Sequence, residues 1–161
     1  MTSTTPDNAE PITADGLAAL ESEIEELETE GRRAMAARIQ AARELGDLSE
    51  NAEYHIAKED QAHLETKIKR LRARRSSAVI VETDSDVAVF AFGRTAEVLD
   101  EESGRTFTWT IVGATEADLA QGRLSAQSPV GRALLDSAVG QSVEVQTPRG
   151  ARRYRVQQLV S

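Results

Sequence analysis

Apolar residues in the first half of the chain recur every three or four positions. The series runs through Leu17, Leu20, Ile24, Leu27, Gly31, Met35, Ile39 and Ala42. Such spacing is typical of a helix that packs one face against a second helix in a coiled coil. After Leu27 three spacings of four follow one another, a change of phase that resembles a stutter, where a coiled coil unwinds locally. Because no proline interrupts residues 12–46, we predict one helix of about 30 residues and roughly 45 Å.

A second apolar series indicates a second helix. It comprises Tyr54, Ala57, Gln61, Leu64, Ile68 and Leu71, and it ends near Ser76 and Ser77. Leu45 and Gly46 end the first helix, since glycine suits the left-handed position that follows a helix. Two long helices joined by about four residues run antiparallel, so the sequence predicts a helical hairpin.

The two series can be paired, because partners in an antiparallel hairpin have a nearly constant sum of residue numbers. Three pairs each sum to 95, namely Ile24–Leu71, Leu27–Ile68 and Gly31–Leu64. Three pairs nearer the turn each sum to 96, namely Met35–Gln61, Ile39–Ala57 and Ala42–Tyr54. We expect these residues to face one another along the hairpin.

The charges agree with this register. Six acids on the first helix, Glu21, Glu23, Glu25, Glu26, Glu28 and Glu30, fall opposite six bases on the second, Lys67, Lys69, Arg70, Arg72, Arg74 and Arg75. The basic run could also be a nucleic-acid patch, but charge complementarity across the hairpin accounts for it without a ligand. Arg32, Arg33 and Arg38 have no acids opposite in this pairing apart from Glu59 and Asp60.

From residue 78 the apolar period changes to two, which indicates β-strands. We predict strands at residues 78–82, 87–90, 95–99, 106–112, 142–147 and 153–159, with turns at 101–104 and 148–150. Phe107, Trp109 and Ile111 share one strand face, where Trp109 is expected in the core. One short helix fits residues 129–136, with Ser128 as its N-cap and Pro129 at its first position.

These elements predict an α+β chain: a disordered tail at 1–12, an antiparallel coiled-coil hairpin at 13–77, and a small antiparallel β domain with one short helix at 78–161. The chain has 161 residues, 40% of them hydrophobic but only 4% aromatic, so the cores should be aliphatic. The absence of cysteine excludes disulfides and thiolate chemistry. No apolar run is long enough for a membrane span and the N-terminus does not resemble a signal peptide, so we expect a cytoplasmic protein. The net charge of −8 argues against free duplex DNA as the main partner.

The turn between the helices carries the candidate chemistry. Asp47 and Glu50 lie three positions apart at the end of a long rod, and carboxylate oxygens are what hard cations such as Mg²⁺ prefer. Two carboxylates on a protruding tip could complete a metal site inside another protein. Alternatively, Asp47 caps the second helix while Glu50 reaches back to it, as in a capping box. Leu48 is apolar at an exposed position, which often marks a contact with a partner.

The tip segment, ARELGDLSENAEY at residues 42–54, resembles the tip of the Gre family of transcript-cleavage factors. The resemblance covers about 150 residues in order and includes Pro11–Thr13, Gly16, Ile111–Gly113, Glu116–Asp118, Ser128–Leu135 and Gly140. It implies that the C-terminal domain is FKBP-like. It also implies that the hairpin enters the secondary channel of RNA polymerase, where backtracked RNA is cut by the polymerase's own active site.

By this resemblance, Asp47 and Glu50 help to hold a Mg²⁺ ion shared with the polymerase and to orient the attacking water. The chain has no cofactor of its own, is not itself an enzyme, acts near the 3′ end of the nascent RNA, and is expected to be a monomer. Glu44, Glu53 and Tyr54 match the tip motif and shape it. Leu48, Ser49 and Asn51 belong to the same partner-binding tip. Arg43 and Lys58 match basic positions that face RNA phosphate or the channel wall.

Some residues depart from the family pattern. Arg33 stands where members usually have proline, Ser49 varies between subgroups, and the connection at residues 83–86 is shorter than usual. The family also contains relatives that enter the channel and inhibit transcription without cleavage, and that alternative stays open. Nothing marks a prolyl-isomerase site, and His55 and His63 lack a metal-binding frame and are expected on the surface.

Overall fold

The computed structural model describes residues 9–47, 50–82 and 88–161. The chain divides into two compact units. One is Leu17–Ala78, and the other combines the segment up to Gly16 with Val79–Ser161. The expected tip residues Leu48 and Ser49, and the short connection at 83–86, lie outside the described residues.

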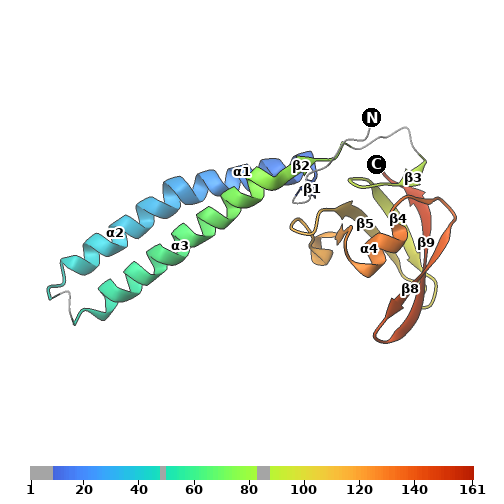
Figure 1. Cartoon of the computed structure of the whole chain (residues 1–161). Coiled ribbons are helices and arrows are strands. Elements are labelled where there is room, and N and C mark those ends of the chain that lie inside the picture. The colour runs from blue at the N-terminus through green and yellow to red at the C-terminus, as the bar shows by residue number, and fades with distance from the viewer. Residues whose placement is uncertain (1–8, 48–49, 83–87) are drawn as a thin grey trace. The chain divides into compact units, whose positions relative to one another are not determined.

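The first unit is the predicted helical hairpin. Its first arm consists of α1 (Ala14–Glu26), a π-helical turn η1 (Leu27–Gly31) and α2 (Arg32–Arg43), and its second arm is α3 (Ala52–Ser77). The two arms lie side by side and run antiparallel (Figure 1). The second helix matches its predicted bounds, whereas the first ends slightly earlier than expected.

The predicted apolar series form the seam between the arms. Its buried residues are Leu20, Ile24, Ile39, Ala42, Ala57, Ile68 and Leu71. At Gly31 a Cβ atom would lie 3.4 Å from Leu64 Cδ1, so this predicted pair is in contact. The register inferred from the sums of residue numbers is therefore consistent with the packing.

The predicted change of phase is a π-helical turn. Residues Leu27–Gly31 form η1, and a π-turn widens the helix to accommodate one extra residue. One extra residue in the first arm raises the sum of paired residue numbers by one, which is the step from 95 to 96 seen in the sequence. The hydroxyl of Thr29 donates to the Glu25 carbonyl at 2.8 Å within this stretch. The stutter is therefore absorbed locally and the seam continues on both sides.

Two of the predicted ion pairs cross the hairpin. Glu23 lies 3.5 Å from Lys67, and the Nε of Arg72 donates to Glu28 at 2.6 Å. Glu30 was expected to face the opposite arm, but it pairs with Arg33 on its own helix. Glu30 and Arg33 are three residues apart, so this ion pair forms within one helical turn and does not cross the seam.

The bases nearer the tip are also paired across the hairpin. Arg38 contacts Asp60 at 2.9 Å, one of the two acids foreseen. The expectation that Arg32 lacks an acid opposite is wrong, because its guanidinium forms two hydrogen bonds with Glu65, at 2.9 and 3.1 Å. That mutual hydrogen bond lowers the pKa of Glu65 and raises the pKa of Arg32. Such exposed pairs favour one register more than they add stability.

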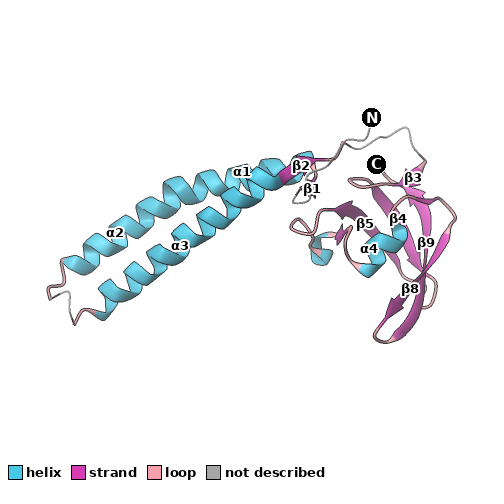
Figure 2. Cartoon of the chain, viewed as in Figure 1, coloured by secondary structure: helices cyan, strands magenta, loops and turns pink. Residues whose placement is uncertain are grey.

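The second unit is built on a five-stranded sheet of order β6-β5-β4-β9-β8 (Figure 2). Its strands are β4 (Thr95–Asp100), β5 (Thr106–Val112), β6 (Arg123–Ser125), β8 (Ser142–Thr147) and β9 (Gly150–Leu159). Two small ladders pair β1 (Glu10–Ile12) with β2 (Ala78–Ile80), and β3 (Val89–Phe90) with β7 (Ser137–Ala138). All pairings of the large sheet are antiparallel except β5 with β6.

The α+β fold class is as predicted, with three short strands unforeseen. β1, β6 and β7 are only two or three residues long. Residues 10–12, predicted as part of a disordered tail, instead form β1: Ile12 is 2% exposed and its carbonyl accepts from the Val81 N–H at 3.0 Å. The short helix α4 (Pro129–Leu134) begins as predicted, with the Ser128 hydroxyl accepting from the Gly131 N–H. A turn of 3₁₀-helix, η2 (Leu119–Gln121), was not foreseen.

The core of this unit lies on one face of the sheet. Phe90, Val98, Ile111, Leu134 and Val156 are fully buried. The ring of Trp109 stacks on Phe107 at 4.9 Å and meets Tyr154 at 5.7 Å. Trp109 is therefore a core residue, as expected.

A clasp centred on Glu116 joins two segments far apart in the sequence. Its carboxylate accepts from the Thr13 N–H at 3.2 Å, from the Thr13 hydroxyl, and from the Gly113 N–H at 3.0 Å. A Cβ atom at Gly16 would lie 1.8 Å from Glu116 Oε1, so a larger residue there would displace the Glu116 carboxylate. The clasp brings together Thr13, Gly16, Gly113 and Glu116, all of which were part of the family resemblance.

We predict that Glu116→Ala destabilises the C-terminal unit by about 1–3 kcal/mol, because two half-buried N–H groups lose their acceptor. Denaturant unfolding followed by Trp109 fluorescence measures the change. Glu144→Ala on the exposed face of β8 is the matched control and should shift stability by less than about 0.5 kcal/mol. Equal effects of the two changes would show that the clasp contributes nothing particular.

A buried carboxylate closes the turn between β4 and β5. Asp100 is 1% exposed and accepts from the N–H groups of Glu102 and Ser103 and from Arg152, at 3.0, 3.4 and 2.9 Å. Burial opposes its ionisation, but these hydrogen bonds and the charge of Arg152 outweigh it and hold the pKa of Asp100 below its ordinary value of 3.8. The ionised form therefore stabilises the fold.

This pKa makes the stability acid-sensitive. A carboxylate with a lowered folded pKa contributes fully above about pH 4 and loses that contribution as pH falls through its folded pKa. We expect Asp100→Asn to be less stable near neutral pH and to lose less stability than the wild type between neutral pH and about pH 3. Glu102→Gln, in the same turn, is the control. If wild type and Asp100→Asn fall in parallel, Asp100 does not carry the acid dependence.

Candidate functional site

The candidate site is the turn between α2 and α3. At the end of α2 the N–H groups of Leu45 and Gly46 donate to the carbonyls of Ala42 and Arg43 at 3.2 and 3.3 Å. Gly46 has a φ of +117°, the positive φ expected of a glycine after a helix end, although α2 itself already ends at Arg43. The chain re-enters a helix at Ala52.

The two carboxylates proposed from the sequence, Asp47 and Glu50, are both exposed in this turn. Mg²⁺ prefers oxygen ligands such as those of carboxylates, and it takes about six of them. Among the described residues there is no group of three or more His, Cys, Asp or Glu side chains that could hold a metal.

The helix cap is not the one considered from the sequence. Asn51, not Asp47, is the N-cap of α3: its side chain accepts from the Tyr54 N–H at 3.1 Å. Both residue types suit this position, and the sequence did not distinguish them. The capping role is thus taken, which leaves Glu50 outside the helix, exposed at a bend.

Asn51 also reaches the opposite arm. Its amide Nδ2 donates to the Ala42 carbonyl at 2.5 Å, so one side chain bonds to both helix ends. Beside it the guanidinium of Arg43 lies 5.8 Å from the centre of the Tyr54 ring, within range of a cation–π interaction. The predicted tip residues Arg43, Asn51 and Tyr54 are therefore brought together as the closure of the tip.

The remaining predicted residues are placed as follows. Glu44 and Glu53 are exposed on either side of the turn. Lys58 lies on α3, and its amine donates to Gln61 at 3.2 Å. The two histidines are exposed, as expected.

Two apolar residues near the tip were missed. Leu45 is 69% exposed and Ile56 is 53% exposed. Neither residue belongs to the apolar seam, and an apolar residue outside the seam is the feature of the sequence that could have predicted their exposure. They add to the surface that a partner could cover.

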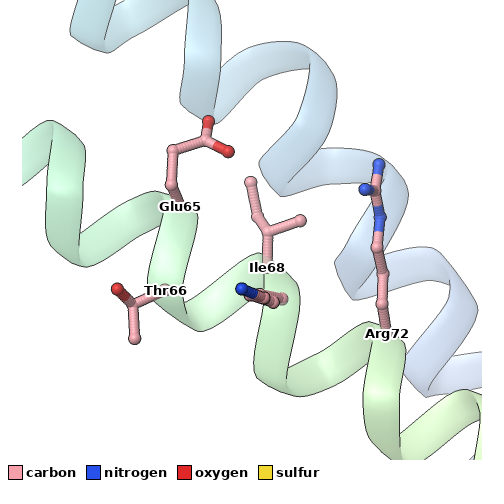
Figure 3. A pocket seen from close by; sticks show the side chains of 5 residues that line it. Glu65, Thr66, Ile68 and Arg72 are labelled. Atoms are coloured by element: carbon pink, nitrogen blue, oxygen red, sulfur yellow. The ribbon is translucent and has the colours of Figure 1, made fainter.

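A hollow of about 430 Å³ lies on the hairpin, away from the tip. It is lined by Glu65, Thr66, Ile68, Lys69 and Arg72 of α3. Glu65, Ile68 and Arg72 reach toward the other arm (Figure 3), where Glu65 and Arg72 pair with Arg32 and Glu28. These ion pairs lie next to η1, so we interpret the hollow as part of the packing between the arms at the π-turn.

Two family models match this chain. "Transcription elongation factor, N-terminal" matches residues 10–80, and "Transcription elongation factor, GreA/GreB, C-term" matches residues 84–159. None of the helices in the described part of the chain has the length and apolar character to cross a membrane.

Similar proteins carry the same family name. The chain is 46% identical over 147 residues to transcription elongation factor GreA of Rhodospirillum rubrum, covering 91% of this chain and 94% of that one. It is 45% identical to GreA of Roseiflexus sp., covering 90% and 93%. Among solved structures, GreA factor homolog 1 of Thermus thermophilus is 28% identical with a TM-score of 0.43, covering 95% and 99%. GreA/GreB from Nitrosomonas europaea is 25% identical with a TM-score of 0.41, covering 65% and 93%.

The cap assignment yields a stability prediction. Asn51→Ala should lower the free energy of unfolding of the hairpin by about 1 kcal/mol or more, since a cap and a cross-arm bond are lost. The double change Asp47→Asn with Glu50→Gln should shift it by less than about 0.5 kcal/mol, because neither residue caps the helix. Denaturation followed by helical circular dichroism measures both. A larger loss in the double variant than in Asn51→Ala would restore the capping role to Asp47.

Proposed function

The chain belongs to the GreA/GreB family of transcription elongation factors, and we propose that it stimulates RNA cleavage by a polymerase whose transcript has backtracked. In this proposal the hairpin enters the secondary channel of RNA polymerase, and the cut is made by the polymerase's active site. The chain is then an auxiliary factor, with the polymerase and the 3′ end of the nascent RNA as partners.

The observation that carries the proposal is the pair of exposed carboxylates at the end of a long hairpin. The first arm has about 30 residues, which corresponds to roughly 45 Å of helix. Asp47 and Glu50 sit in the turn at its end, and Asn51 caps α3 in their place. Neither carboxylate is the N-cap of α3, and both side chains are exposed.

The chemistry follows from the ligands. When bound, Mg²⁺ lowers the pKa of a coordinated water and so supplies a nucleophile for phosphodiester hydrolysis. Asp47 and Glu50 each offer two oxygens, enough to contribute part of a coordination shell and to accept a hydrogen bond from the attacking water. Among the described residues no group of three or more His, Cys, Asp or Glu side chains is placed to hold a metal ion. In this proposal the remaining ligands come from the partner's own metal site.

The basic residues behind the tip have a supporting role in this proposal. Arg43 and Lys58 are exposed on opposite arms, and cations near a phosphate backbone are attracted to it. Arg43 also lies over Tyr54, which limits how far its guanidinium can move. Leu45 and Ile56 supply exposed apolar surface for the channel wall.

The proposal predicts the effect of removing the tip charge. In stalled elongation complexes, Asp47→Asn with Glu50→Gln should slow RNA shortening by about 100-fold or more, because several kcal/mol of transition-state stabilisation is lost. The variant should still compete with wild type for the polymerase. Gel analysis of the RNA over time measures the rate.

A matched control removes the same amount of charge from the hairpin at a place far from the tip. Glu21→Gln with Glu25→Gln removes two exposed carboxylates from α1 and should leave the cleavage rate within about twofold, since surface charges far from the site have small effects. If wild type never shortens the RNA yet suppresses run-off synthesis, the chain is instead a channel-occupying inhibitor. If the neutralised tip cuts as well as wild type, the carboxylates have no part in cleavage.

A further inference from the structure

One side chain joins the two arms where the tip begins. Asn51 accepts from the Tyr54 N–H at 3.1 Å and donates to the Ala42 carbonyl at 2.5 Å. These two bonds fix which way the side-chain amide of Asn51 points, because its oxygen must face the N–H group and its nitrogen must face the carbonyl. Ala42 is itself buried in the seam, at 3% exposure, so the bond ends on a fixed part of α2.

We propose that Asn51 is a positioning residue, which clasps the ends of α2 and α3 so that Asp47 and Glu50 are presented in one geometry. The inference rests on the proposed function and assigns Asn51 an indirect role in it. Asn51 acts through the two carboxylates and does not touch the metal or the RNA. This role differs from the partner contact that the sequence predicted for Asn51.

The bond from Asn51 to Ala42 matters because none of the described residues of the turn (44–47, 50 and 51) is buried. Ala42 and Asn51 are nine positions apart in the sequence, and the carboxylates lie on the chain between them. Asp47 and Glu50 are both exposed, so packing does not hold them. A metal site requires its ligands within a fraction of an ångström, and closing both ends of the turn with one side chain limits the conformations that the turn can adopt.

The variant Asn51→Asp distinguishes the bond from Asn51 to Ala42 from the capping of α3. Its carboxylate accepts the Tyr54 N–H as asparagine does, and the two residues are equally good N-caps. It has no N–H to donate, and it places a negative oxygen against the Ala42 carbonyl. Asn51→Asp therefore keeps the start of α3 and breaks the bond to α2.

The control must carry the same added charge without touching the clasp. Ala52 is the first residue of α3 and is exposed, so Ala52→Asp adds one negative charge at the neighbouring position. Ala52→Asp should melt within about 2 °C of wild type, because a negative charge near a helix N-terminus is tolerated or favourable. Asn51→Asp should melt a few degrees lower, because the bond to Ala42 is lost while the helix cap is kept.

The test measures RNA shortening in stalled elongation complexes as a function of factor and Mg²⁺ concentration. For Asn51→Asp we expect the maximal rate to fall about tenfold or more, as misplacement by about an ångström does elsewhere. The half-saturating factor concentration should stay within about twofold of wild type, and half-maximal rate should need more Mg²⁺. Ala52→Asp should match wild type in all three. An unchanged maximal rate, or a loss confined to the half-saturating concentration, would overturn the inference, the latter by making Asn51 a binding contact.

A second measurement reads the clasp without the polymerase. The chain has no cysteine, so spin labels at Ala41→Cys and Ile56→Cys report one distance across the arms behind the tip. Asn51→Asp should broaden its distribution relative to wild type and Ala52→Asp. Unchanged width would overturn the clasp even if cleavage falls. If wild type does not cleave at all, the proposed function fails and the positioning role with it, and a broadened distribution would then show that the clasp is real but serves another end.

Discussion

The structure depends on one constraint, the register in which the two arms of the hairpin pack. A slip of one residue would turn the apolar face of either arm by about 100° and would remove the seam formed by Ile24, Ile39, Ala57 and Ile68. The chain nevertheless carries one residue too many for a regular pairing. The π-turn at Leu27–Gly31 absorbs it, and the ion pairs next to that turn favour the register on both sides. The tip can be placed reproducibly only because this register holds along the whole length.

At the tip the two arms are held together by different contacts. Small residues such as Ala42 and Ala57 let the arms approach closely, but none of the described residues between them (43–47 and 50–56) is buried. Directional contacts replace packing there: the amide of Asn51 between the two helix ends, and Arg43 over the Tyr54 ring. Both ends of the turn are thus held while the charged side chains of Asp47 and Glu50 stay exposed. That combination suits a group lent to a partner's site better than a group that works alone.

The sequence predicted the features that repeat. The hairpin, its register and the stutter follow from a series of eight apolar positions, and the long strands follow from alternation, so β5 and β8 were predicted at their observed bounds. β1, β6 and β7 are too short to show a period. The cap was misassigned because Asp47 and Asn51 are both good cap residues and only the backbone path decides between them. The Arg32–Glu65 pair was missed because long side chains reach along the helix, so ion pairs do not obey the constant sum that the buried seam obeys.

The most direct test of the account is where the tip lies in a transcribing complex. A photo-crosslinker on Leu45→Cys, the sole cysteine in a chain that otherwise has none, samples the surroundings of a residue that is 69% exposed at the tip. In stalled, backtracked complexes the account predicts crosslinks to the 3′ segment of the nascent RNA and to the polymerase residues around its catalytic metal. Crosslinks confined to the outer surface of the polymerase, with none to RNA, would contradict it.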